Sequence, residues 1–180
     1  MNPRILLSLI FFGLVSESGA EPSAFGIVHG PKAAFNIAAP EGWVIDNRAG
    51  AEEGVPCVLY LTGATWATAD PLMYTKIAST AVENAEAFAK KAIEEMKKQR
   101  GDYQTKRIAS GKTRDGHVYF VNEYSPSKSY PRFECVAYVQ LPKAVAYVVY
   151  SGDDETLFRK HQSAVQKLLK SFTYLEVKQE

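Results

Sequence analysis

The chain has 180 residues, and its 21 Lys and Arg nearly balance its 20 Asp and Glu. Proteins that bind nucleic acid or an acidic membrane through a strong positive field carry an excess of positive charge, so this balance argues against both partners. The length suits one domain that can bury a core without disulfides or metal ions to stabilise it.

The first residues have the pattern of a cleavable signal peptide. Arg4 supplies a positive charge, an apolar run follows over residues 5–15, and the small residues Ser18 and Ala20 precede the expected cut. The run is shorter than the about 20 apolar residues of a membrane-spanning helix, and Glu17 follows it closely. We therefore predict a periplasmic or secreted protein with no stable membrane span after cleavage. A retained N-terminal anchor is the alternative.

The expected mature chain opens with short apolar runs that are broken by Pro and Gly. Ala33 to Ala38 and Trp43 to Ile45 flank Pro40-Glu41-Gly42, which predicts two strands in a tight hairpin. Cys57 to Leu61 fits a buried strand after a polar loop, and Met73 to Ser79 fits a further strand. This half of the domain is therefore predicted to be mostly β.

The pattern then changes to that of an amphipathic helix. Asn84 suits its N-cap, and Gly101 lies just past its expected end. Phe88, Ala92 and Met96 repeat at four-residue spacing and form one apolar stripe. We expect this stripe to pack on a sheet.

Four strand-like runs follow the helix, at residues 105–110, 118–124, 132–141 and 145–150. The connections between them suit antiparallel neighbours, and one of them ends in Asp115-Gly116. In the third run, alternate residues from Phe133 to Leu141 share one face, while Val136 and Tyr138 share the other. We therefore expect both faces of the sheet to be covered.

A last helix is expected after Asp153 or Asp154, because either carboxylate suits an N-cap. Its buried stripe is predicted at Leu157, His161, Val165, Leu168 and Phe172. The order of elements predicts an α+β fold, an antiparallel β-sheet flanked by helices as an α/β/α sandwich. The predicted organisation is a signal peptide at 1–20, a loose leader at 21–32, a single domain at 33–175 and a C-terminal tail at 176–180.

Two short motifs in this domain resemble those of the PsbP-like/Mog-like superfamily. Its members commonly begin with an F-x-I-x-x-P-x-G-W hairpin, matched by Phe35 to Trp43, and many end with Leu/Ile-x-x-Ser-Phe, matched by Leu168 to Phe172. The resemblance covers roughly Ala33 to Tyr174. It implies the sandwich fold and a role in binding or assembly, most naturally as a small exported bacterial member, and it assigns no functional residue.

The chain has two cysteines, Cys57 and Cys135. Export to an oxidising compartment permits a disulfide between them, and we predict that bond. Two separate buried thiols are the alternative, because a free cysteine is often simply a small core residue.

No motif marks a catalytic or metal site. His29, His117 and His161 lack metal-ligand spacing, and the chain has no His-x-Glu, Cys-x-x-Cys or G-x-S-x-G pattern. The sequence therefore predicts no catalytic residue, no metal and no cofactor.

Aromatic residues near an arginine give the one candidate binding groove, since such residues are typical of binding hot spots. Trp66 lies in a loop of small residues with Tyr74 soon after it, and Tyr130 and Arg132 border a later loop. We predict that these four residues line a groove. The alternative is that Trp66 and Tyr74 are ordinary core or lid residues.

Three functional hypotheses follow. The leading one is a non-enzymatic binding or accessory protein of the cell envelope, whose partner is an unidentified protein or small ligand. The second is an enzyme, such as a hydrolase, with a site assembled from His117, Glu123 and Arg132. The third is a structural or inhibitory protein that acts through a flat apolar patch.

Overall fold

The computed structural model describes residues 24–78 and 82–177. The predicted signal peptide at 1–20 lies outside these residues, as does the end of the predicted tail at 176–180. Within the described ranges, no helix has the length and apolar character that a membrane span requires.

The described elements follow the order that the sequence predicts, with additional short strands at both ends of the domain. They are β1 (Phe25–His29), β2 (Ala34–Ala38), β3 (Trp43–Asp46), β4 (Val58–Leu61), β5 (Leu72–Ile77), α1 (Ala85–Arg100), β6 (Thr105–Lys112), β7 (Val118–Tyr124), β8 (Phe133–Gln140), β9 (Val145–Gly152), α2 (Glu155–His161), α3 (Ser163–Ser171) and β10 (Thr173–Leu175).

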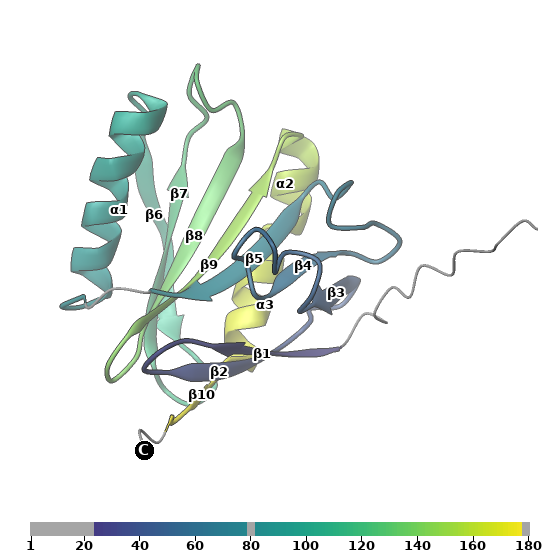
Figure 1. Cartoon of the computed structure of the whole chain (residues 1–180). Helices are drawn as coiled ribbons and strands as arrows, with labels where there is room; N and C mark the ends of the chain where they lie inside the picture. The colour runs from purple at the N-terminus through teal and green to yellow at the C-terminus, as the bar shows by residue number, and fades with distance from the viewer. Residues whose placement is uncertain (1–23, 79–81, 178–180) are drawn as a thin grey trace, which may run out of the picture.

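The larger sheet has the strand order β3-β4-β5-β9-β8-β7-β6, and neighbouring strands in it are antiparallel. In β8, Cys135, Ala137 and Val139 join the core shared with α2 and α3, whereas Val136 and Tyr138 join the core shared with α1. Figure 1 shows α1 on one side of this sheet and α2 with α3 on the other. The predicted α+β fold, an antiparallel sheet flanked by helices, is therefore confirmed.

β1, β2 and β10 form a small second sheet that packs on the face covered by α3 (Figure 1). Phe35 of β2 stacks on Phe172, which follows α3, with ring centroids 4.3 Å apart. Gly26 lets β1 lie close to the larger sheet, because a Cβ there would come within 2.7 Å of Ile45 Cγ2. β1 lies inside the stretch 21–32, so the prediction of a loose leader is wrong there: pairing with β2 orders the strand.

Pro40, Glu41 and Gly42 turn the chain between β2 and β3, and Trp43 N donates to the Pro40 carbonyl at 3.0 Å. Both predicted strands are present, but the predicted hairpin is wrong. β2 pairs with β1 and β10, whereas β3 pairs with β4. The turn carries the chain from the small sheet to the larger one, so strands that are adjacent in the sequence are not paired.

Both predicted caps of α1 are confirmed. Asn84 accepts a hydrogen bond from Ala87 N at 2.8 Å through its side-chain oxygen. Gly101 has a φ of 75°, which an L side chain rarely adopts, and its N–H donates to the Lys97 carbonyl at 3.0 Å. Local chemistry at the two ends therefore sets the length of this helix.

The predicted last helix is two helices, α2 and α3, joined at Gln162. Asp154 is the N-cap of α2, accepting from Leu157 N at 2.8 Å. Leu157 itself is 36% exposed, which corrects its predicted place in the buried stripe. Phe158 lies inward instead and stacks on Tyr150 with ring centroids 4.7 Å apart. One continuous apolar stripe does not hold across both helices because the helix is interrupted at Gln162.

Cys57 and Cys135 are both free, buried thiols, which corrects the predicted disulfide. Cys57 directly precedes β4, Cys135 lies in β8, and β5 and β9 separate these strands in the sheet. Three strand spacings amount to about 14 Å, whereas a disulfide joins Cα atoms less than about 7 Å apart. Burial raises the pKa of the Cys57 thiol to about 12 and also raises the pKa of Cys135.

We expect iodoacetamide to label both cysteines when the protein is unfolded without a reductant. In the native protein both should react slowly, because burial shields the sulfurs and disfavours the reactive thiolate. Mass spectrometry of the labelled protein gives the count. Labelling that appears only after a reductant is added would reveal a disulfide and contradict the structure.

Replacing Phe172 by alanine is expected to lower the free energy of unfolding by about 3–5 kcal/mol, because it removes a fully buried ring that stacks on Phe35. Phe172→Leu retains more apolar contact, so the loss should be smaller and the variant should stay folded. Val118→Ala, at a position 56% exposed, is the control and should change stability by less than about 0.5 kcal/mol. Urea unfolding gives the three values. Equal losses for Phe172→Ala and Val118→Ala would contradict the packing.

Candidate functional site

A groove lies between α1 and the strands that it faces, and we call it the α1 groove. Its volume is about 170 Å³. It is lined by Tyr74, Phe88, Ala92, Met96, Arg100, Glu134, Val136, Tyr138, Tyr147 and Val149. The lining therefore combines residues of α1 with residues of β5, β8 and β9.

The groove exists because only the first half of α1 packs tightly on the sheet. The buried residues of the helix are Ala85 and Ala89, whose small side chains permit a close approach. Ala85 N also donates to the Gln140 side chain at 2.7 Å. In the second half of the helix, Ala92 and Met96 are only half-buried and line the groove. Part of the apolar stripe that the sequence predicts thus faces a hollow.

Aromatic rings form much of the groove's wall. Phe88 meets Tyr138 edge-on, with ring centroids 6.1 Å apart, and tilts against Tyr147 at 5.5 Å. Such contacts hold rings in fixed positions and leave an apolar surface with a defined shape. The groove can therefore receive a flat or branched apolar group.

One end of the groove carries a buried ion pair. The side chain of Glu134 is 4% exposed, and Arg100 Nη1 donates to its Oε1 at 2.9 Å. The hydroxyl of Tyr130 donates to its Oε2 at 3.1 Å. Burial and the neighbouring Glu134 carboxylate raise the pKa of Tyr130 to about 12, so its hydroxyl stays protonated as the donor. A buried carboxylate needs such partners, and here both oxygens have one.

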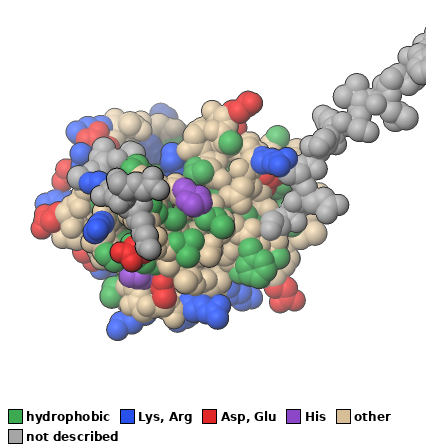
Figure 2. Space-filling model, turned by 60° about the horizontal axis from the view of Figure 1, so that its bottom comes forward, with side chains coloured by type: hydrophobic (Ala, Val, Ile, Leu, Met, Phe, Trp, Pro, Cys, Tyr) green, Lys and Arg blue, Asp and Glu red, His purple; other side chains and the backbone are tan. Residues whose placement is uncertain are grey.

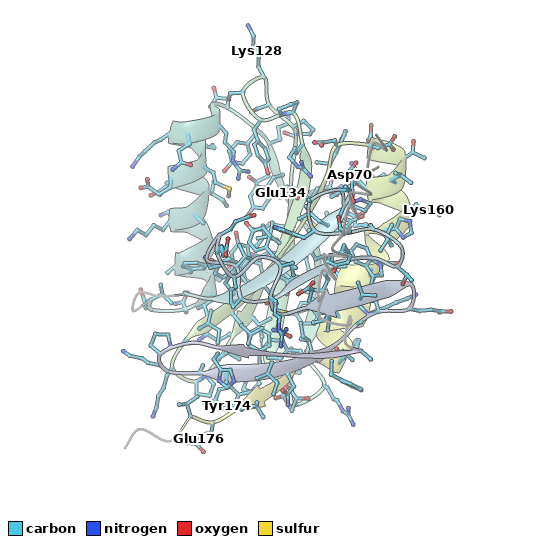
Figure 3. The ribbon with its side chains drawn as sticks, turned by 45° about the vertical axis from the view of Figure 1, so that its right-hand side comes forward. Asp70, Lys128, Glu134, Lys160, Tyr174 and Glu176 are labelled. Carbon is cyan, nitrogen blue, oxygen red and sulfur yellow. The ribbon has the colours of Figure 1, made fainter. Side chains whose placement is uncertain are left out.

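The loop between β7 and β8 holds the end of α1 beside this pair. Ser127 Oγ donates to the Arg100 carbonyl at 2.7 Å, and Ser129 Oγ donates to the same carbonyl. The guanidinium of Arg100 lies 3.6 Å above the centre of the Tyr130 ring. Figure 3 shows Lys128 at the outer tip of this loop and Glu134 farther inside the domain. The loop therefore fixes the position of Arg100 at the groove.

Two hydroxyls in the groove have no hydrogen-bond partner among the described residues. They belong to Tyr74 and Tyr147, and both hydroxyl oxygens reach solvent. Burial of the two rings raises the pKa of both tyrosines, so both hydroxyls are protonated at neutral pH. They are available to a ligand as donors.

The structure separates one of the four residues of the predicted groove from the other three. Tyr74 lines the α1 groove, and Tyr130 contacts Glu134 at its polar end. Arg132 lines a small hollow together with Tyr130 and Glu134, and it pairs with Asp153 at 3.1 Å. Trp66 lies elsewhere: its indole N–H donates to Glu53 Oε1 at 3.1 Å, in the loop before β4. The structure thus places Tyr74, Tyr130 and Arg132 around Glu134 and leaves Trp66 apart.

Sequence reasoning missed Arg100, Glu134, Tyr138 and Tyr147 as site residues. The signal that could have found Glu134 is its position as a lone carboxylate in the apolar run of β8, since a buried charge requires a partner. Arg100, at the last position of a helix, gave no such signal, because basic residues are common there.

The residues of the enzyme hypothesis do not converge. His117 lies 3.6 Å from Asp115, in the turn before β7. Glu123 pairs with Arg159 at 2.6 Å and lies six residues farther along β7, which amounts to about 20 Å. Arg132 forms its own pair with Asp153. The predicted assembly of His117, Glu123 and Arg132 in one site is therefore wrong. Among the described residues, no group of three His, Cys, Asp or Glu could hold a metal ion.

Exposed apolar side chains are dispersed over the described surface. They are Phe25, Ile27, Ile108, Val118, Leu157 and Val177, on five different segments of the chain. Figure 2, which faces the small sheet, shows hydrophobic side chains in separate groups among polar atoms and backbone. This dispersion counts against a flat apolar patch on that face.

Two other hollows are larger than the α1 groove, but their linings are less suitable for binding a ligand. One, of about 290 Å³, lies over Cys135, and its rim residues Arg159 and Gln162 already donate to Glu123. The other, of about 330 Å³, is an open hollow formed mainly by loop residues around His29 and has no aromatic ring apart from that imidazole. The α1 groove combines an apolar hollow with unused donors, so it is the candidate binding site.

Tyr130→Phe is expected to lower the free energy of unfolding by about 1–3 kcal/mol, because it leaves one oxygen of the buried Glu134 without a donor. Tyr147→Phe makes the same chemical change at a hydroxyl without a partner among the described residues. It should alter stability by less than about 0.5 kcal/mol. Denaturant unfolding of both variants measures the difference. Equal effects would show that the Tyr130–Glu134 bond does not contribute.

No family model and no curated protein matches the chain. Among solved structures, the solution structure of cyanobacterial PsbP (CyanoP) from Synechocystis sp. PCC 6803 is similar, with a TM-score of 0.53. The two chains are 18% identical, and the match covers 91% of this chain and 100% of that one. At this level of identity the likeness establishes the fold alone. The chain has a PsbP-like fold, as the motifs at the ends of the domain predict.

Proposed function

We propose that this protein is a non-enzymatic binding protein of the cell envelope, exported to the periplasm or the exterior, which holds an apolar group in the α1 groove. The observation that carries the proposal is the groove itself, a hollow walled by fixed aromatic rings with unused hydroxyl donors beside them. Small-molecule sites in proteins have this character, being mostly apolar with a few polar groups that orient the ligand.

The size of the groove limits what it can hold. An apolar cavity of about 150 Å³ accommodates one benzene molecule. The α1 groove, at about 170 Å³, therefore suits a single ring or one branched aliphatic group. A larger ligand or a partner protein would insert only such a group and leave its remainder outside.

The sequence supports both the proposed location outside the cytoplasm and the proposed non-enzymatic role. The signal peptide expected at residues 1–20 directs the chain out of the cytoplasm. The resemblance to the PsbP-like/Mog-like superfamily implies binding or assembly, and this chain contains no catalytic motif. An accessory protein that binds through one groove agrees with both observations.

Benzyl alcohol is a suitable first probe, because its ring matches the groove and its hydroxyl can accept from Tyr74 or Tyr147. We expect it to shift the amide signals of β8, β9 and α1 in NMR spectra, with a dissociation constant on the order of 1 mM, as expected for a ligand of this size. Ala92→Leu fills part of the groove, so the affinity for benzyl alcohol should fall at least about tenfold. Leucine favours helix, so α1 should stay folded in this variant.

Ala87→Leu is the matched control, because Ala87 lies on the same helix but does not line the groove. Its affinity for benzyl alcohol should stay within about twofold of the wild type, and both variants should keep the native circular dichroism spectrum. Shifts located away from the groove, or binding unaffected by Ala92→Leu, would overturn the proposed function.

A further inference from the structure

Two charged side chains line the α1 groove, and only one of them is accessible to a ligand. The side chain of Glu134 is 4% exposed, and its two oxygens accept from Arg100 and Tyr130. The side chain of Arg100 is 24% exposed. The charge that an entering molecule meets is therefore the positive one.

Arg100 retains capacity to bind a further acceptor. A guanidinium has five N–H donors, and among the described residues only one hydrogen bond from this group is found, from Nη1 to Glu134. Stacking on the Tyr130 ring and the serine contacts to its carbonyl hold the residue in place. A donor fixed in this way loses little conformational freedom when it binds a ligand.

From these contacts we propose that the α1 groove selects small aromatic carboxylates, which is a refinement that rests on the proposed function. The ring lies in the hollow between Phe88 and the sheet, and the carboxylate accepts from Arg100. The hydroxyls of Tyr74 and Tyr147 are additional donors. Carboxylate and phosphate both match the fork of a guanidinium, and of the two the planar carboxylate better suits a hollow of about 170 Å³ that one arginine lines.

Organic cations are the class to weigh against this proposal, because aromatic walls can also attract an ammonium group. In the α1 groove, however, Arg100 is the more exposed member of its ion pair, and both oxygens of Glu134 already accept from Arg100 and Tyr130. An ammonium group would meet the guanidinium with no free carboxylate to offset the repulsion. The groove should therefore discriminate against cations.

Three probes that share one ring test this selectivity: benzoate, benzyl alcohol and benzylammonium, at neutral pH and low salt. NMR titration of the full chain gives the three dissociation constants. We expect benzoate to bind at least fivefold more tightly than benzyl alcohol, and benzylammonium to bind more weakly than the alcohol. The amides that shift should be those of β8, β9 and α1 in each case.

The double variant Arg100→Gln/Glu134→Gln removes the accessible charge and its partner together, so that no unpaired carboxylate stays buried. It should bind benzoate and benzyl alcohol within twofold of each other. Arg107→Gln is the matched control: it removes the same charge from a guanidinium that pairs with Glu86 and does not line the groove. This control should keep the preference for benzoate, and unfolding curves confirm that both variants are folded.

The outcomes separate the inference from the proposed function. If benzyl alcohol binds in the groove but benzoate gains less than twofold, or benzylammonium binds best, the carboxylate preference is wrong and the proposed binding role stands. If the double variant keeps the preference, Arg100 is not its source and the inference fails. If none of the three probes binds in the groove, the proposed function and the inference fall together.

Discussion

The constraint on which this structure depends is that a sheet with apolar side chains on both faces must be covered on both. One face is covered by α2, α3 and the small sheet, where Phe35 stacks on Phe172 and Tyr150 on Phe158. The opposite face relies on α1. A single helix is about 10 Å wide, whereas neighbouring strands are about 4.8 Å apart. One helix cannot seal several strands, and the α1 groove is the part that it leaves open.

The same few residues stabilise the face of the sheet that α1 covers and supply the charged groups of the groove. Glu134 lies in β8 with its carboxylate on the α1 side, and burying it there requires donors. Arg100 at the end of α1 is one, and the β7–β8 loop supplies Tyr130 as the other. The ion pair thus ties the far end of α1 to the sheet. Because the guanidinium stays more exposed than the carboxylate, the tie also leaves a positive group beside the groove.

Much of the fold could be predicted because its signals are local. The Asn84 and Gly101 caps, the alternation in β8 and the Asp115-Gly116 turn each act within a few residues, and each is present as expected. Predictions that depended on contacts between residues far apart in the sequence were less accurate. The disulfide required Cys57 and Cys135 to be neighbours, but two strands intervene. For the site, the aromatic Tyr74 and Tyr130 were identified, whereas the ion pair that joins them was not.

By itself, the sequence determined most of the order of the strands and helices, the ends of α1 and the near-neutral charge, because propensity, capping and composition are properties of short segments or of simple sums. Only the tertiary structure decided which strands pair, how β1 is ordered, that the stripe of α1 lines a hollow, and that Arg100 meets Glu134 across 34 residues of chain. The physical reason is that the sheet order β5-β9-β8 and the placement of one helix over it bring together side chains whose proximity no local pattern encodes.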